Sequence, residues 1–136
     1  MNCIFCKIIA GEIPAYKLYE DENFISILDI NPVNLGHSLI IAKKHFVNLF
    51  DAPADLLPFT GKIIKKISEA VMAGTKADGL NVIMNNNRAA GQLVDHAHIH
   101  LVPRFEGDGF AHWKGKGTET KEDFEKTLGS IKKILG

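Results

Sequence analysis

The stretch His96-Ala97-His98-Ile99-His100 places three of the six histidines of this chain at alternate positions. Side chains alternate between the two faces of a β-strand, so this spacing predicts a strand with all three imidazoles on one face. Ala97, Ile99 and Leu101 then point to the opposite face, toward a hydrophobic core. We therefore expect a strand with one chemically active face, around which the other elements are arranged.

Four further strands are expected. Residues 17–20 and 24–28 are short runs separated by a polar turn, residues 37–42 follow a glycine, and residues 80–84 alternate apolar and polar side chains. The histidine strand follows the last of these after a polar turn. Short runs separated by polar turns are typical of antiparallel neighbours, so the chain predicts an antiparallel sheet of about five strands.

One long helix and a C-terminal helix complete the expected fold. Apolar side chains recur at helical spacing over residues 52–73, with Asp51 as a suitable N-cap; they are Leu56, Phe59, Ile63, Ile67, Ala70 and Val71. The last helix begins near Thr120, whose spacing to Asp123 resembles a capping box. These elements predict a single α+β domain over residues 1–136, with the long helix on one face of the sheet.

The composition narrows the class of protein. Hydrophobic residues make up 46% of the 136 residues, which is typical of a folded domain. The 16 basic and 16 acidic residues give no excess of positive charge, which argues against sequence-independent binding of nucleic acid. The chain has neither an apolar run long enough to cross a bilayer nor a signal-peptide pattern, so we expect a cytoplasmic protein without membrane contact.

Without further information, three functions suit alternating histidines: metal binding, nucleophilic catalysis and a pH-switched surface. A solvent-exposed strand face without a function would explain a single histidine, but it explains three histidines at alternate positions poorly. The nearest serine or cysteine in the sequence is Ser68, which leaves histidine itself as the nucleophile, or a metal. The preceding turn, residues 85–92, is rich in Asn and Gly, whose amides and permissive backbone suit an anion.

Gly91-Gln92, followed by His96-x-His98-x-His100 and Pro103-Arg104, resembles the signature of the histidine triad (HIT) superfamily. The N-terminal half resembles the Hint branch in the same order, through residues 3–9, 12–14, 19–21, 28–30 and 36–45. The resemblance covers residues 3–113 and is greatest to bacterial zinc-containing HIT proteins. It implies a HIT-like fold and an enzyme that hydrolyses or transfers nucleoside phosphates.

The resemblance also implies catalytic roles. His98 is the expected nucleophile, which attacks the α-phosphorus of the substrate and forms a covalent nucleotidyl-histidine. The backbone carbonyl of His96 orients its ring, and water then releases the nucleoside monophosphate. His100 and Gln92 are expected to hydrogen-bond the phosphoryl oxygens, and His37 to lie near the phosphate.

Further residues are expected to hold the nucleotide. Asp29 resembles the carboxylate that accepts the ribose hydroxyls, and Asn85 and Gly91 match contacts to the phosphate. Leu93 stands where eukaryotic Hint proteins carry a serine, so only its backbone amide is offered, and a hydroxyl that helps to protonate the leaving group is missing. Four apolar side chains are expected around the base, although plain core packing explains them almost as well: Phe5, Ile8, Phe24 and Ile30.

Both cysteines, Cys3 and Cys6, lie in a C-x-x-C, where a disulfide closes only a tiny loop. This spacing therefore indicates metal binding or redox chemistry more than a structural disulfide. The resemblance adds His45 and His96 as partners, which makes a Cys₂His₂ set typical of a structural zinc site. It also implies a homodimer.

The leading hypothesis is a hydrolase of purine nucleoside phosphoramidates, of the AMP-NH2 or AMP-lysine type. Hydrolysis of dinucleoside polyphosphates and nucleotidyl transfer remain alternatives, because they share the covalent intermediate. A non-catalytic nucleotide-binding or zinc-scaffolded interaction module is the second alternative. The expected partners are thus a purine nucleotide and a second copy of the chain, with neither nucleic acid nor membrane.

Overall fold

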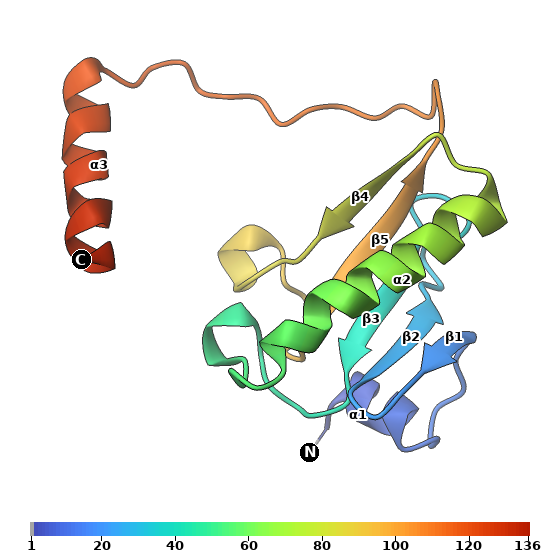
Figure 1. The fold of residues 1–136 in the computed structure, drawn as a ribbon. Helices are drawn as coiled ribbons and strands as arrows, with labels where there is room; N and C mark the ends of the chain where they lie inside the picture. The colour runs from blue at the N-terminus through green and yellow to red at the C-terminus, as the bar shows by residue number, and fades with distance from the viewer. Residues whose placement is uncertain (1) are drawn as a thin grey trace.

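The computed structural model describes residues 2–136, and its centre is a five-stranded sheet (Figure 1). The strands are β1 (Lys17–Glu20), β2 (Phe24–Leu28), β3 (Ser38–Ala42), β4 (Gly79–Ile83) and β5 (His98–Arg104). They lie in the order β1-β2-β3-β5-β4, and every neighbouring pair is antiparallel. The expected α+β fold with an antiparallel sheet is confirmed. β5, which carries His98 and His100, lies between β3 and β4, and His96 lies in the loop just before it.

The two faces of the sheet are covered by different helices. α2 (Leu57–Thr75) crosses one face and buries Ile63, Ile67 and Val71 against β3 and β5 (Figure 1). Each of these side chains contributes about 2 kcal/mol by leaving water. α1 (Ile4–Ile9) lies against the opposite face, where Phe5 packs with the side chains of β2 and β3 that point away from α2. This second face carries the site described below.

The long helix begins later than expected. Asp51 does not cap it, because its carboxylate accepts hydrogen bonds from the backbone N–H groups of Val47 and Asn48 and so closes a capping box around η1 (Leu49–Asp51). Ala52 is extended, at φ −62° and ψ 134°, since it precedes a proline, which disfavours helical backbone. α2 therefore starts at Leu57, without a side-chain cap.

The C-terminal helix, α3 (Lys121–Leu135), stands apart from the rest of the fold at the end of a long segment without helix or strand (Figure 1). The Thr120 hydroxyl accepts from the backbone of Asp123 and the Asp123 carboxylate accepts from the backbone of Thr120, which confirms the expected capping box. Every residue of α3 is exposed. Within residues 2–136, the helices are all too short or too polar to span a membrane.

Candidate active site

A cavity of about 460 Å³ opens between α1 and the face of the sheet opposite α2. His98 and His100 from β5 line one side, and Asp29 at the end of β2 lines another. Asn85, Gly91 and Leu93, which come from the turn before β5, line a third part of the wall. Apolar side chains fill the rest of the wall, including Phe5, Ile8, Ile27, Ile30 and Leu39. The cavity thus has a polar end on the histidines and an apolar end beside α1.

His98 is held in one tautomer. Its Nδ1 lies 2.7 Å from the backbone carbonyl oxygen of His96, which accepts the Nδ1–H hydrogen bond. The ring is buried, and the Phe5 ring packs edge-on with its centroid 5.0 Å away. Because the proton is on Nδ1, the Nε2 of His98 carries the lone pair. This is the form in which an imidazole acts as a nucleophile.

A chain of hydrogen bonds sets the tautomer of His100 in the same way. The backbone N–H of Val33 donates to His37 Nδ1 at 3.1 Å, so His37 carries its proton on Nε2. That Nε2–H donates to His100 Nδ1 at 2.9 Å. His100 therefore carries its own proton on Nε2, where it is available to an acceptor in the cavity.

Burial keeps both of these rings neutral. The pKa of His100 is lowered to about 4, first by burial and then by the neighbouring His98 and His37. Burial also lowers the pKa of His37, although the negative charge of Asp29 opposes this. Asp29 Oδ2 lies 3.6 Å from His37 Nε2, while Oδ1 accepts from the Asn31 backbone at 2.8 Å. Near neutral pH, His100 is thus a neutral hydrogen-bond donor.

Two clusters in the described chain bring metal-binding side chains together. Asp29, His37 and His100 form one of them, but it fits a metal poorly. His37 Nε2 would have to give up its proton to bind a cation, which moves that proton to Nδ1. Nδ1 already accepts from the Val33 backbone, and two hydrogens would then face each other. This cluster is a hydrogen-bond relay.

The other cluster fits zinc. The Sγ atoms of Cys3 and Cys6 and the Nδ1 atoms of His45 and His96 all lie within 4.8 Å of one another. The S···N distances are 3.3, 3.3 and 3.6 Å, and the N···N distance is 3.1 Å. Zn–S bonds of about 2.3 Å and Zn–N bonds of about 2.0 Å at tetrahedral angles require about 3.5 Å and about 3.3 Å. The donor set therefore matches the expected Cys₂His₂ site.

The surroundings of the cluster also suit a cation. His96 Nε2 lies 2.6 Å from the Ala42 carbonyl oxygen, which fixes the proton on Nε2 and leaves Nδ1 for a metal. Burial, and then the adjacent Cys3, raise the pKa of the Cys6 thiol, so a bound cation would be needed to keep the Cys6 sulfur a thiolate. His96 thus serves both sites, with its ring in this cluster and its carbonyl on His98.

Phe24 does not lie near the cavity, contrary to expectation. It packs on the α2 side of the sheet, with Ile40 and Ile67. Side chains of a strand alternate, so Phe24 and Ile27 must face opposite ways. Ile27 and Leu28 are the β2 residues that line the cavity, and sequence reasoning missed Ile27. The signal was available, because Ile27 has the same parity as Asp29.

Gln92 does not offer its side chain to a phosphate, which corrects a second expectation. The side chain is buried, and its Nε2 donates to the backbone carbonyls of Val47 at 2.6 Å and Val94 at 3.0 Å. Its Oε1 accepts from the Asn87 backbone and the Asn48 side chain. All the amide atoms are thus used to tie the loop before β5 to the loop after β3.

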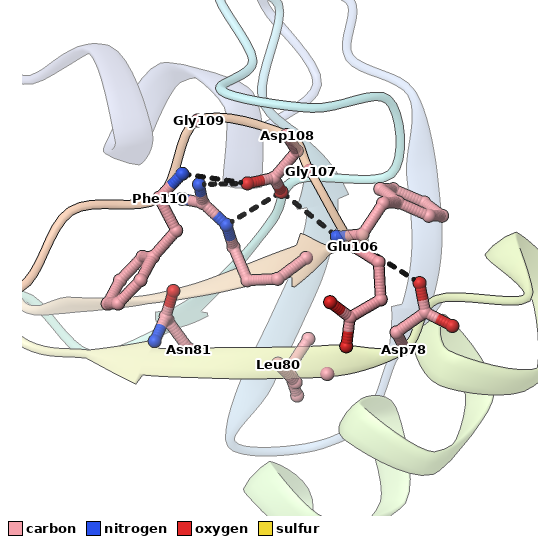
Figure 2. Close-up of a pocket in the computed structure, with 11 residues that line it drawn as sticks. Asp78, Leu80, Asn81, Glu106, Gly107, Asp108, Gly109 and Phe110 are labelled. Carbon is pink, nitrogen blue, oxygen red and sulfur yellow. Dashed lines mark hydrogen bonds and ion pairs between the residues drawn. The ribbon is translucent and has the colours of Figure 1, made fainter.

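A second opening, of about 640 Å³, lies at the far end of β4 and β5 (Figure 2). Asp78, Asn81, Glu106 and Asp108 are among the residues around it, and its described lining includes no histidine. The Asp108 carboxylate accepts from the Arg104 side chain at 2.7 and 2.9 Å and from two backbone N–H groups. These contacts use the Asp108 carboxylate to stabilise the turn after β5. The cavity at His98 and His100 is therefore the candidate active site.

Residues 10–107 match the HIT domain family. Because this match covers more than half of the chain, the protein belongs to the HIT family. The fold and the paired histidines of β5 agree with that assignment.

Curated relatives support it over most of the chain. The protein Hit of Bacillus subtilis is 44% identical over 98% of this chain and 94% of its own length. The adenosine 5'-monophosphoramidase HNT1 of Candida albicans is 40% identical over 98% of this chain and 89% of its own. The adenylylsulfatase HINT3 of Arabidopsis thaliana is 46% identical over 79% of this chain and 54% of its own. The expected class, a HIT-type hydrolase, is thereby confirmed.

Solved structures share the fold. A HIT protein from Bacillus subtilis superposes with a TM-score of 0.90 at 42% identity and covers 100% of this chain and 99% of its own. A Streptococcus mutans protein does so with a TM-score of 0.91 at 42% identity, over 100% and 87%. A zinc-bound histidine triad protein from Mycobacterium smegmatis reaches 0.77 at 37% identity, over 98% of each chain.

Proposed function

We propose that this protein hydrolyses purine nucleoside phosphoramidates through a covalent bond between His98 Nε2 and the α-phosphorus. One observation carries the proposal: on the same face of β5, His98 presents a lone pair and His100 an N–H donor to the same cavity. These are the two groups that nucleophilic attack on a phosphoryl centre requires. The HNT1 relative, named as an adenosine 5'-monophosphoramidase, acts on a substrate of this class.

The shape of the cavity supports a nucleotide in one orientation. The base lies among Phe5, Ile8 and Ile30 at the apolar end, and the ribose hydroxyls donate to Asp29, which also lines the cavity. The α-phosphate then reaches His98. Phosphoryl oxygens accept from His100 Nε2–H and from backbone amides of the Gly91 turn.

The reaction has two balanced steps. His98 Nε2 attacks phosphorus, the P–N bond to the leaving group breaks, and the nitrogen keeps the electron pair, takes a proton from solvent water and departs as an amine. Water then attacks phosphorus, the bond to Nε2 breaks, and its electron pair returns to His98. The proton of the water leaves with the solvent, and the nucleoside monophosphate is released.

An adenylyl sulfate is a second candidate substrate, and Leu93 is the observation that favours it. A departing amine must gain a proton, but Leu93 has no hydroxyl to supply one, and its side chain is 81% exposed at the mouth of the cavity. Sulfate is a stable anion and leaves without a proton. The HINT3 relative is named as an adenylylsulfatase.

The experiment measures AMP release from adenosine phosphoramidate and adenylyl sulfate by the wild-type protein and two variants. His98→Asn keeps a side-chain N–H that can donate to the His96 carbonyl but has no nucleophile, so both activities disappear while AMP still binds. Leu93→Ser raises the phosphoramidate rate and leaves the sulfate rate unchanged.

Wild-type turnover of dinucleoside polyphosphate above both substrates would overturn the substrate assignment. AMP binding by the wild-type protein without any turnover would instead favour a binding module.

We also propose that zinc occupies the Cys₂His₂ cluster and joins α1 to the sheet. The donor distances and the zinc-bound M. smegmatis relative support this assignment. The two free thiols fit a reducing compartment, so the cytoplasm is the proposed location. On the resemblance to the Hint branch, we propose a homodimer.

A further inference from the structure

The turn that precedes β5 contains a residue in a backbone conformation that side chains rarely adopt. Asn87 has φ 72° and ψ 160°, a region occupied almost only by glycine, because a Cβ is crowded there. Among residues 2–136, the other non-glycine residue with a positive φ is Lys76, which has the ordinary left-handed helical conformation at the end of α2. Strained backbone of the Asn87 kind persists only where the surrounding structure holds it.

Two buried amide side chains hold Asn87 in this conformation. Gln92 Oε1 accepts from the Asn87 backbone N–H at 2.8 Å, and Asn48 Nδ2 donates to Asn87 Oδ1 at 2.9 Å. Asn48 Nδ2 also donates to Gln92 Oε1 at 3.3 Å, which joins the three residues into one network. Asn48 and Gln92 are only 5% and 2% exposed, so water competes little for these groups. We name Asn48, Asn87 and Gln92 the amide clamp.

The amide clamp lies directly behind the phosphate end of the cavity. Asn85 precedes Asn87 by two residues and Gly91 precedes Gln92 by one, and both line the cavity with His98. Asn85 Nδ2 lies 3.5 Å from the Gly91 carbonyl oxygen, a long hydrogen bond that leaves this amide able to donate to a ligand. Because Asn87 lies between these two positions in the chain, a change in its φ or ψ displaces at least one of them.

We propose that the amide clamp positions the turn of residues 85–91 on the phosphoryl group, with Asn87 as a strained positioning residue. The proposal rests on the proposed nucleotide site and assigns a role to residues that do not touch the substrate. Donors that are already in place need no reorganisation when charge develops on the phosphoryl oxygens. The base and the ribose occupy the other end of the cavity, so the clamp acts on the phosphate alone.

The test compares Asn87→Gly with Asn87→Ala in the full-length protein. Both substitutions remove the contact with Asn48, and neither opens a cavity because the Asn87 side chain is exposed. They differ in one methyl group. Glycine adopts the observed φ and ψ freely, whereas alanine has neither that freedom nor the anchoring amide, so the turn relaxes in the alanine variant.

Calorimetric titration with adenosine and with AMP isolates the contribution of the phosphate as the ratio of the two dissociation constants. Asn87→Ala lowers this ratio at least about fivefold, as loss of one hydrogen bond does. Asn87→Gly keeps it within about twofold of the wild type, and both variants bind adenosine as the wild type does. Equal ratios in the two variants, or a wild-type ratio near one, would overturn the proposal.

A double-mutant cycle tests the clamp from its other end. Asn48→Ala also removes the hydrogen bond to the Phe50 backbone, but that loss occurs in every background and cancels in the cycle. Asn48→Ala lowers the affinity ratio at least about threefold in the wild-type background and hardly changes it beside Asn87→Gly, because glycine needs no clamp. The same loss in both backgrounds would show that Asn48 does not act through the Asn87 backbone.

Turnover provides a separate readout. The kcat for adenosine phosphoramidate falls at least about tenfold in Asn87→Ala and stays near the wild-type value in Asn87→Gly, since the donors act mainly on the transition state. The affinity ratio requires no turnover, so a wild-type protein that released no AMP would refute the proposed reaction and still leave the clamp tested. Normal AMP release with equal ratios in the two variants would refute the clamp alone.

Discussion

Replacing His37 tests whether the relay sets the hydrogen-bond donor on His100. In His37→Ala, His100 Nδ1 loses the donor 2.9 Å away. A buried acceptor left unpaired costs about 1–3 kcal/mol. The ring avoids that cost by moving its proton to Nδ1, from which it donates to the nearby Asp29 carboxylate, and this removes the Nε2–H that faces the phosphoryl oxygens. Loss of one such transition-state donor costs about 2–3 kcal/mol, or about 30- to 150-fold in kcat.

The matched variant is His37→Gln, whose amide N–H₂ reaches the position of the imidazole Nε2–H. It restores the donor to His100 and is expected to retain kcat within about fivefold of the wild type, a loss of about 1 kcal/mol. The assay is single-turnover release of AMP, with urea unfolding to correct for stability. An Ala variant as fast as the wild type, or a Gln variant as slow as Ala, would refute the relay.

Three further predictions follow from the site. The free energy of unfolding falls as the pH drops from about 6.5 to about 4, because His100 binds a proton in the unfolded state but stays neutral in the folded state. In urea titrations at these two pH values, His100→Gln reduces the difference by about 1–2 kcal/mol. Ile27→Ala raises KM while Phe24→Leu lowers stability by about 1 kcal/mol without changing KM, since only Ile27 lines the cavity; equal KM changes would contradict this placement. Removing metal with a strong chelator lowers Tm and releases about one zinc per chain by elemental analysis, and a metal-free protein of unchanged Tm would count against a structural zinc.

The local patterns of the sequence were enough to predict much of the site. Alternation identified β5 as a strand, and the family signature assigned different roles to His96, His98 and His100. For the Cys₂His₂ cluster, the C-x-x-C is visible by its own spacing, whereas His45 and His96 came from the family resemblance. Such features depend on residue identity and spacing along one strand or turn, which a sequence displays directly.

The errors arose where three-dimensional competition decided the outcome. Asp51 does not cap α2 but closes the capping box of the short helix η1, which ends there because Ala52 precedes a proline and is extended. Gln92 had the right type for a phosphate contact, but two backbone carbonyls from separate loops use its amide. The position of α3 could not be predicted either, since every residue of this helix is exposed.

The central claim is that His98 becomes covalently bonded to the nucleotide during turnover. The most direct test is acid or denaturant quenching at early times with adenosine phosphoramidate, followed by mass spectrometry of the intact protein and its peptides. The account predicts a mass increase of one adenylyl group, located on the peptide that contains His98 and absent from His98→Asn. Full turnover with no adduct at any time resolved by the quench, or an adduct on a different residue, would contradict it.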